Sequence, residues 1–348
     1  MEKTAKIFVA GHNGLVGSAI VNNLNQRGFT RIITRNHSEL DLTNTIDVAH
    51  FFKTEKPEYV FLAAAKVGGI IANNLYRADF IYENLMIQNN VIHQSYVHGV
   101  KKLVFLGSTC IYPRNCPQPM KEEYLLTNEL EYTNEPYAIA KIAGIKMCES
   151  YNIQYNTNFI SVMPTNLYGP NDNFDLEKSH VLPALLRKVH LAKLLSEDNI
   201  EALLLDLKVK TFDEANIILD QYKISKNSVE IWGSGSPMRE FLWSEDMADA
   251  CVFIMENRDF TDCYTDPSNI KNTHINIGSG KDISIKDLAY LIKDIIGYQG
   301  DFVFNTEKPD GTLKKLNDSS KLNNLGWKPK IELAEGIKKM YLWYLDKK

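Results

Sequence analysis

The sequence has no long apolar run of the kind that a membrane-spanning helix requires. None of its uninterrupted apolar stretches approaches the roughly 20 residues that cross a bilayer. The N-terminal segment MEKTAKIFVAG enters a strand pattern instead of a signal sequence. These two absences predict a cytoplasmic protein that does not associate with a membrane.

The sequence also has little excess of either charge. Its 348 residues include 39 Lys and Arg against 43 Asp and Glu, for a net charge of −4. This balance offers no electrostatic basis for binding nucleic acid or an anionic lipid surface. Any nucleotide would have to be held by local groups, in a chain that is long enough for a large core and two lobes.

Cysteine pairing is missing as well. The five cysteines show neither a Cys-x-x-Cys motif nor a neighbouring histidine cluster, and their number is odd. This spacing predicts reduced thiols and no metal site. The cysteines are Cys110, Cys116, Cys148, Cys251 and Cys263.

A strand, a glycine turn and a helix open the chain. Residues 5–10 form a short apolar run, which is followed by Gly11, Gly14 and Gly17 and by an amphipathic segment that ends near Gly28. In such a turn the first glycine permits a tight reversal, the second lets a pyrophosphate approach the backbone, and the third lets the helix pack closely. The position after the first strand predicts dinucleotide binding, although a purely structural turn is the alternative.

The end of the second expected strand, RIITR, bears on the choice of cofactor. An acidic residue there would accept hydrogen bonds from an adenosine ribose, whereas a cation would suit a 2′-phosphate. The chain has Arg35 and His37 at this place. We therefore predict NADPH in preference to NADH; the alternative is that Arg35 is merely a solvated charge at a strand end.

Two more apolar runs predict further parallel strands. A helix through residues 46–54 leads to YVFLAAA and then to Lys66-Val67-Gly68-Gly69, and an amphipathic segment at residues 78–98 leads to KLVFLGS. The second run delivers Ser108 to the carboxyl end of a strand, where open α/β sheets bind their ligands. A helix cap or an ordinary turn is the alternative role for this serine.

Tyr137 and Lys141 form a candidate catalytic pair. They are four residues apart in a segment that should be helical, with Asn134 as a plausible cap and Pro136 in the first turn, so their side chains share one face. An ammonium and a cationic nicotinamide would both favour the phenolate and lower the pKa of Tyr137, so that it can donate a proton as hydride arrives. The same spacing also occurs by chance at Tyr344 and Lys348.

The chain changes character after the strand NFISVMP. From about residue 171 the alternation of strands and helices becomes irregular, as in a smaller substrate-binding lobe. Residues 194–228 predict two short charged helices with Ser196 and Thr211 as caps, forming an added surface element that serves as an interface or a lid. We predict an α/β protein with a doubly wound parallel-sheet Rossmann domain at residues 1–165 and about 236–262, and a smaller lobe at 166–235 and about 263–348.

The motifs together resemble the GDP-L-fucose synthase family of extended short-chain dehydrogenases/reductases. The resemblance covers nearly the whole chain and rests on segments that follow the order seen in that family. They are AGHNGLVGSAI, LAAAKVGGI, FLGSTCIYP, NEPYAIAKIAG, SVMPTNLYGPNDNF, SHVLPALLRK, WGSGSPMREF and KPDGTLKKL.

The resemblance implies an NADPH-dependent enzyme that inverts carbons 3 and 5 of a GDP-4-keto-6-deoxy sugar and then reduces carbon 4, for the synthesis of surface-polysaccharide sugars. Ser108, Tyr137 and Lys141 match its reductase triad, and Cys110 and His180 match its epimerisation acid/base pair. A thiol and an imidazole suit proton transfer next to a ketone. Without the resemblance, Cys110 would be interpreted as a buried small hydrophobe and His180 as an ordinary loop residue.

The resemblance also implies binding residues and a homodimer. The substrate positions are Asn166, Lys188, Trp232 and Arg239, with the two cations on the GDP pyrophosphate; each could instead be structural. The cofactor positions are Gly11, Asn13, Gly14, Leu15, Val16, Gly17, Arg35, His37, Ala63, Ala64, Ala65, Lys141, Pro164, Asn166, Leu167 and His180.

Two departures from the family pattern keep alternatives open. Some members carry arginine where this chain has Asn13, and residues 194–228 are longer than in typical members. A reductase that acts on a GDP-4-keto heptose and leaves epimerisation to another enzyme would share almost every motif. A sugar dehydratase would need carboxylates where the chain has Cys110-Ile111, and a non-catalytic cofactor-sensing protein would typically lack the Tyr137 and Lys141 pair.

Overall fold

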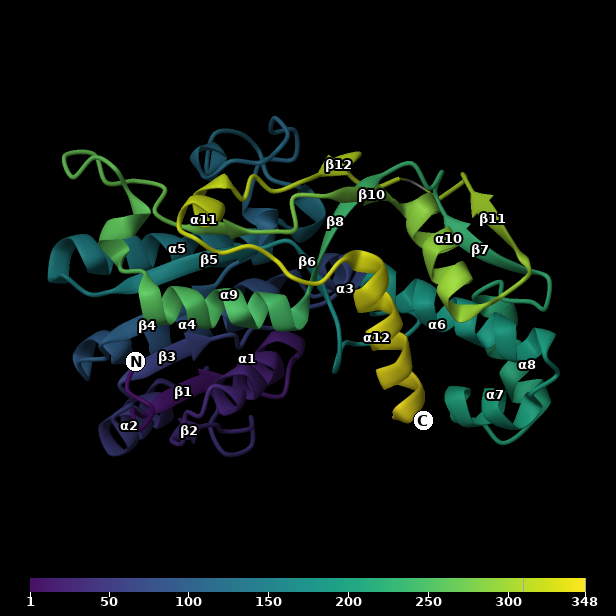
Figure 1. The fold of residues 1–348 in the computed structure, drawn as a ribbon, viewed down its shortest axis with the longest axis horizontal. Coiled ribbons are helices and arrows are strands. Elements are labelled where there is room, and N and C mark those ends of the chain that lie inside the picture. The colour runs from purple at the N-terminus through teal and green to yellow at the C-terminus, as the bar shows by residue number, and fades with distance from the viewer. Residues whose placement is uncertain (309, 348) are drawn as a thin grey trace. The chain divides into compact units, whose positions relative to one another are not determined.

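The chain divides into two units in a computed structural model, which describes residues 1–308 and 310–347 except for the side chains of residues 70 and 71 (Figure 1). Unit 1 comprises Met1–Leu167, Phe241–Lys281 and Leu316–Lys330. Unit 2 comprises Tyr168–Glu240, Asp282–Lys315 and Ile331–Lys348. Residues 263–281 and 316–330 therefore fall in unit 1, whereas the sequence pattern assigns them to the smaller lobe.

Unit 1 is built on a six-stranded parallel sheet with the order β2-β1-β3-β4-β5-β9. Most of its strands are continuous apolar runs, as expected where helices cover both faces. The predicted doubly wound parallel sheet is confirmed. The strands are β1 (Ile7–Ala10), β2 (Ile32–Ile33), β3 (Tyr59–Leu62), β4 (Lys102–Leu106), β5 (Phe159–Pro164) and β9 (Ile275–Ile277).

The late strand β9 explains why part of the expected smaller lobe belongs to unit 1. It pairs in parallel with β5, with Val162 opposite Ile275 and Pro164 opposite Ile277. A return of the chain over 100 residues later leaves no local signal in the sequence. The short helix α11 (Ser320–Asn324) follows the same route, because its Leu322 is buried in the core of this unit.

Helices cover both faces of the sheet. Alternate residues of β1 point to opposite sides, so that Ile7 and Val9 join one apolar core and Phe8 and Ala10 join the other. The first core includes α1 (Leu15–Gln26) and α9 (Ser244–Asn257). The second includes α2 (Thr45–Glu55), α4 (Arg77–Val97) and α5 (Glu135–Tyr155). The remaining helices of this unit are α3 (Ile70–Leu75), η1 (Thr109–Ile111), η2 (Glu122–Tyr124), η3 (Tyr132–Asn134) and η4 (Phe260–Cys263).

The strand order reverses its direction at β1. Strands β2 and β3 pair with opposite edges of β1, so the direction of winding reverses there. Ligands of open α/β sheets bind outside the carboxyl ends of the strands at such a point. Gly11 and Ala63 are the first residues after β1 and β3, and they therefore lie at this edge.

Unit 2 combines short strands with longer helices. β7 (Ser228–Trp232) pairs in parallel with β11 (Asp301–Asn305), while β10 (Asp282–Ser284) and β12 (Lys314–Lys315) pair with the start of β8 (Met238–Trp243). The helices include α6 (Val181–Ser196), α10 (Ile285–Ile296) and α12 (Leu333–Asp346), and α10 packs against both of the others. The chain passes between the units along β6 (Asn166–Tyr168) and β8.

The predicted pair of helices within residues 194–228 is confirmed as α7 (Ile200–Leu207) and α8 (Phe212–Gln221). Thr211 caps α8 in a reciprocal capping box with Glu214, as predicted. The prediction for Ser196 is wrong, because this residue ends α6 and its hydroxyl donates to Lys193 O at 2.8 Å. Asn199 caps α7 instead, by accepting from Ala202 N at 3.3 Å. Within the described part of the chain, no helix is long and apolar enough to span a membrane.

Candidate functional site

The three glycines after β1 differ in what surrounds them. A Cβ on Gly17 would lie 2.0 Å from Gly11 O, and one on Gly11 would lie 2.7 Å from Ala64 N. Gly11 also has a φ of +86°, which disfavours other residues. A Cβ on Gly14 would meet only Gly11 O, at 3.5 Å. The space over Gly14 is therefore not filled by the chain, which fits a pyrophosphate that approaches the backbone there.

Other predicted cofactor residues gather at the same edge of the sheet. Gly14 begins α1 without a side-chain cap, and the first turn of this helix carries no acidic residue, so its N–H groups suit an anion. Asn13 is exposed, and Val16 packs against the core next to Leu15. Ala63, Ala64 and Ala65 follow β3, Pro164 ends β5, and Asn166 and Leu167 begin β6.

The Arg35 side chain, which follows β2, is not an unpaired charge. Its Nη2 forms an ion pair with Glu55 Oε1 at 2.5 Å, and its Nη1 donates to Thr34 O at 2.8 Å. His37 is 83% exposed and lies 3.9 Å from Asp41. A 2′-phosphate at this place would have to share Arg35 with the Glu55 carboxylate.

Ser108 follows β4 at its carboxyl end, as the sequence predicts. Its hydroxyl oxygen accepts a hydrogen bond from Cys110 N at 3.4 Å, so it also caps the single turn of η1. The cap and the catalytic role are compatible, because a hydroxyl that accepts one bond retains its proton for donation to a carbonyl.

Lys141 is held in a fixed place behind Tyr137. Its Nζ donates to Leu106 O at 2.8 Å, and the side chain is almost completely buried. The same nitrogen lies 5.7 Å from the centre of the Tyr137 ring. Burial lowers the pKa of Lys141 to about 8, and a charge on Cys110 would oppose this shift.

The electrostatic environment of Tyr137 differs from the expectation. Burial raises the pKa of this phenol well above its ordinary value of 10.0, and a negative charge on Cys110 would raise it further. The lowering expected from Lys141 is not seen in the protein alone, because that ammonium points to a backbone carbonyl. The Tyr137 side chain is therefore a protonated phenol at neutral pH.

Asn134 and Pro136 start the helix that carries this pair. Asn134 occupies the N-cap position of α5 but makes no side-chain cap bond, and Pro136 lies in the first turn as predicted. The chance rival Tyr344 has a structural role, since its hydroxyl donates to Asp206 Oδ2 at 2.6 Å. Its companion Lys348 lies outside the described residues.

Cys110 lies on η1, which packs against the helix of Tyr137 and Lys141. Its side chain is 7% exposed, and its charge would act on both of these residues. Unit 1 therefore brings Ser108, Cys110, Tyr137 and Lys141 together at the carboxyl end of β4. All five cysteines are free thiols, and among residues 1–308 and 310–347 no three His, Cys, Asp or Glu side chains could hold a metal ion.

His180 belongs to unit 2, where it is the N-cap residue of α6. Its side chain is exposed at the surface, yet the protein atoms that crowd the imidazole partly desolvate it and lower its pKa from 6.5. Asp172 lies eight residues earlier and was not singled out by the sequence. Burial raises the pKa of Asp172 to about 7, and its Oδ2 has no hydrogen-bond partner among the described residues.

The predicted substrate cations occupy two elements of unit 2. Arg239, on β8, donates through Nη1 to Met238 O at 2.8 Å and to Thr312 O at 2.6 Å. Lys188, on α6, donates to Glu230 O at 3.3 Å. Burial lowers the pKa of both side chains, so each would gain from an anionic partner.

Trp232 ends β7 with its side chain 55% exposed, and Lys308 Nζ lies 5.3 Å from the centre of one of its rings. Lys308 was not predicted as a site residue, although it opens the motif KPDGTLKKL. An aromatic face next to a cation suits a nucleotide, because the ring can stack and the cation can bind phosphate.

Comparisons with known proteins show the family to which this sequence and fold are similar. Residues 7–278 match the model of the NAD dependent epimerase/dehydratase family. The chain is 53% identical to GDP-L-fucose synthase 1 of Arabidopsis thaliana over 344 residues. This alignment covers 99% of this chain and 94% of that relative.

Two solved structures from Campylobacter jejuni are similar over nearly the whole chain. A GDP-6-OMe-4-keto-L-xylo-heptose reductase has a TM-score of 0.96 and 56% identity, covering 100% of this chain and 99% of that one. A GDP-mannoheptose C4 reductase with NADP bound has a TM-score of 0.90 and 56% identity, covering 99% of each chain.

Proposed function

Because the chain belongs to the NAD dependent epimerase/dehydratase family of extended short-chain dehydrogenases/reductases, with GDP-L-fucose synthases among its relatives, we propose that it is an NADPH-dependent reductase of GDP-linked 4-keto sugars. The observation that carries this proposal is the grouping of Ser108, Cys110, Tyr137 and Lys141 at the carboxyl end of β4. Four groups suited to proton transfer and carbonyl binding lie there, and a glycine turn that suits a dinucleotide follows β1 at the same edge of the sheet.

The cofactor supplies the hydride that reduces the ketone. Gly14 and the first turn of α1 would hold its pyrophosphate, and Ala63, Ala64 and Ala65 would lie beside it. The NADP-bound relative supports NADPH in preference to NADH. In the protein alone Arg35 is engaged by Glu55, so a phosphate would compete for a guanidinium that is already oriented.

In the reduction, Ser108 donates a hydrogen bond to the carbonyl oxygen and Tyr137 gives it a proton. In the protein alone burial raises the pKa of Tyr137, so the phenol is protonated but is a weaker acid than a free tyrosine, and it donates only when a nearby positive charge favours the phenolate. Lys141 supplies a positive charge behind the phenol, and Leu106 O fixes the position of this charge. As charge develops on the phenolate in the transition state, that ammonium stabilises it.

We propose that the same site also epimerises carbons 3 and 5, with Cys110 and His180 as acid and base. A proton next to a ketone is acidified because the carbanion is delocalised as an enolate, and a thiol and an imidazole can remove and return it. The lowered pKa of His180 keeps its imidazole neutral near pH 7, as a base requires.

Unit 2 is proposed as the substrate-binding part and unit 1 as the cofactor-binding part. Lys188 and Arg239 would bind the GDP pyrophosphate, and Trp232 and Lys308 would flank it, while Asn166 of unit 1 would contact the sugar. Because burial lowers the pKa of both Lys188 and Arg239, each would gain from the double negative charge of the pyrophosphate.

A second candidate function is reduction alone, on a GDP-4-keto heptose. The observation in its favour is the 56% identity and full coverage shared with two heptose reductases, one of them with a TM-score of 0.96. Product analysis by mass spectrometry, with purified GDP-4-keto hexose and heptose and NADPH, separates the two substrates. Turnover of neither compound would contradict the reductase proposal and would favour a cofactor-sensing protein.

The chemistry is tested with single substitutions. Tyr137→Phe should lower kcat by about 10²- to 10⁴-fold with little change in NADPH affinity, because only the proton donor is lost. An unchanged rate would refute the role of Tyr137.

For epimerisation, the unmodified protein in heavy water should place deuterium at carbons 3 and 5, and Cys110→Ser should not. No uptake in the unmodified protein would leave a reductase only.

The proposals for the oligomeric state and the cellular location rest on the family resemblance. We propose a cytoplasmic homodimer that serves sugar-nucleotide synthesis for surface polysaccharides. Light scattering coupled to size exclusion would test the dimer, since a mass of about twice the 39.7 kDa chain is expected and a mass equal to it would contradict the proposal.

A further inference from the structure

The helical element at residues 194–228 carries a buried carboxylate in its first helix. Asp206 lies at the end of α7, and its side chain is 2% exposed. It accepts hydrogen bonds from Arg187 Nε at 3.0 Å and from the Tyr344 hydroxyl at 2.6 Å, and His190 Nε2 lies 3.8 Å from it. Residues of α6, α7 and α12 therefore meet at one carboxylate inside unit 2.

Arg187 extends this cluster to the segment that leads to His180. Its Nη2 donates to Asp206 O at 2.9 Å, while its Nη1 donates to Phe174 O at 3.1 Å. Phe174 lies within residues 169–179, which connect β6 to α6 and end directly before His180. One guanidinium thus links the backbone of α7 to the backbone of this segment, and its three donor nitrogens are all used.

The position of Arg187 on its helix supports the same link. Arg187 follows His180, the N-cap residue of α6, by seven residues, which is about two helical turns. Long side chains on a helix point back toward its N-terminus. Arg187 therefore reaches toward the end of α6 at which His180 lies.

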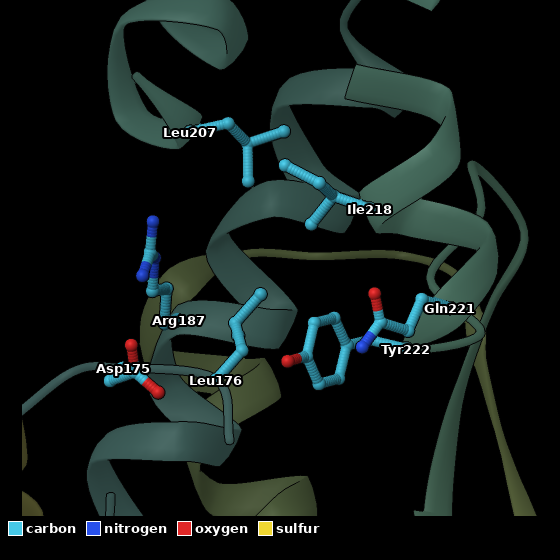
Figure 2. A pocket seen from close by; sticks show the side chains of 7 residues that line it. All are labelled: Asp175, Leu176, Arg187, Leu207, Ile218, Gln221 and Tyr222. Atoms are coloured by element: carbon cyan, nitrogen blue, oxygen red, sulfur yellow. The ribbon is translucent and has the colours of Figure 1, made fainter. Parts of the chain in front are cut away.

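Apolar packing between the segment and the added helices is incomplete. A pocket of about 220 Å³ lies between them and is lined by Leu176 on the segment, Leu207 on α7 and Ile218 on α8, together with Asp175, Arg187, Gln221 and Tyr222. Figure 2 shows the Tyr222 ring pointing toward Leu176, with Arg187 beside the segment that holds Asp175. Across this pocket, Arg187 of α6 joins α7 to the segment through hydrogen bonds to both, while the Phe174 ring packs on Tyr344 of α12.

Arg187 in turn depends on Asp206. Its side chain is only 15% exposed, and a buried guanidinium without a counter-charge is strongly destabilising. Asp206 forms a direct ion pair with it, and Asp175, on the segment itself, is a second acidic group that acts on Arg187 electrostatically. The carboxylate that the added element supplies is the one in hydrogen-bond contact with the guanidinium.

We infer that Arg187 and Asp206 are positioning residues, which hold residues 169–179 and thereby place His180 for proton transfer. The helices at residues 194–228 then act as a brace of the catalytic segment, which is a different role from a lid or a subunit interface. The inference rests on the proposed role of His180 in epimerisation. Arg187 and Asp206 act through the backbone of the segment, and neither needs to touch the sugar.

Amide hydrogen exchange tests the brace without any catalysis. Peptides covering residues 169–180 should exchange about 10-fold faster or more in Arg187→Gln and in Asp206→Asn, since each variant loses a charge-assisted contact. Because both residues serve one link, the double variant should exchange no faster than Arg187→Gln alone. Lys226→Ala is the matched control, since it removes an exposed ion pair with Asp198 from the same element.

Deuterium uptake by the substrate tests the consequence for His180. Arg187→Gln should lower the rate of uptake at carbons 3 and 5 by about 10- to 100-fold, while the NADPH dissociation constant and the uptake by Lys226→Ala stay within about twofold. Arg187→Lys, which keeps the charge on a single donor head, should recover part of the rate.

Each outcome decides a separate part of the inference. Unchanged amide exchange in both Arg187→Gln and Asp206→Asn would overturn the brace. Faster amide exchange with normal deuterium uptake would overturn the effect on His180. No uptake in the unmodified protein would refute the proposed epimerase and with it the catalytic part of this inference, while amide exchange would still decide whether the brace exists. Asp206→Asn keeps the shape and one acceptor oxygen, so it serves if Arg187→Gln does not fold.

Discussion

Alanine substitutions of the glycines after β1 test which of them leaves room for a cofactor and which is packed against the chain itself. In Gly14→Ala the new methyl group would touch only Gly11 O, at 3.5 Å, and the backbone there has φ −78° and ψ 170°, which alanine adopts readily. Alanine is a poorer N-cap than glycine, but it also restricts the unfolded chain by about 0.4–1 kcal/mol. These terms oppose each other, so the stability should change by less than about 1 kcal/mol.

Gly17→Ala should behave in the opposite way. Its methyl group would lie 2.0 Å from Gly11 O and 2.6 Å from Gly11 C, and both are backbone atoms that cannot rotate away. The loop or the helix would have to move by more than an ångström, which costs about 3 kcal/mol or more. Thermal unfolding followed by circular dichroism should show a fall of several degrees for Gly17→Ala and almost none for Gly14→Ala.

Cofactor binding supplies the decisive measurement. NADPH at 100 times its dissociation constant should stabilise the unmodified protein by about 2.7 kcal/mol. In Gly14→Ala the methyl group displaces the pyrophosphate from the backbone N–H groups, so we expect a loss of affinity of about 10- to 100-fold in a fluorescence titration. If Gly14→Ala melted normally and bound NADPH within about twofold of the unmodified protein, the pyrophosphate could not lie over Gly14.

Three further predictions follow from the charges and caps. With the pKa of Lys141 lowered to about 8, its ammonium is present below that pH and is lost above it, so the rate of reduction should fall as pH rises through about 8. The low residual rate of Lys141→Met should not show this fall. A fall that persists in the variant would refute the assignment. Because burial raises the pKa of Asp172 from 3.8 to about 7, the folded protein binds the proton more tightly than the unfolded chain and loses stability as pH rises between these values. Between pH 5 and pH 8 the stability of Asp172→Asn should therefore rise by about 1–3 kcal/mol relative to that of the unmodified protein. Equal differences in melting temperature at the two pH values would refute this. Thr211→Ala should destabilise α8 by about 0.5–2 kcal/mol, seen as faster amide exchange in residues 212–221, whereas Ser196→Ala should have no effect on α7.

The sequence predicts those parts of the molecule in which function follows from local spacing. The spacing of Gly11, Gly14 and Gly17 predicts a dinucleotide-binding turn, because each of the three positions requires glycine for a different local reason. The structure shows three different environments at these positions. The apolar run before Ser108 predicts this residue at the end of a strand, because such runs in a parallel sheet stop at one edge. The family resemblance and the fold class are confirmed by the comparisons.

Features that depend on distant partners could not be predicted. Arg35 is predicted from the sequence to bind a 2′-phosphate, but its ion pair with Glu55, which lies 20 residues later on another element, leaves no local signal. The pKa of Tyr137 was expected to fall because of Lys141, whereas burial raises it, and the degree of burial is a property of the whole fold. The carboxylate of Asp172 and the cation of Lys308 lie in turns, where a single sequence offers little to separate them from solvated loop residues.

The division of the chain has a consequence for the order of folding during synthesis. Unit 1 ends at residue 330 and unit 2 at residue 348, and each is assembled from three separate stretches. An emerging chain can form the strands up to β5 early, but β9 and α11 reach their places only after most of unit 2 has been made. Neither unit is therefore an autonomous fragment that can be excised, and both should complete their cores only as the last quarter of the chain leaves the ribosome.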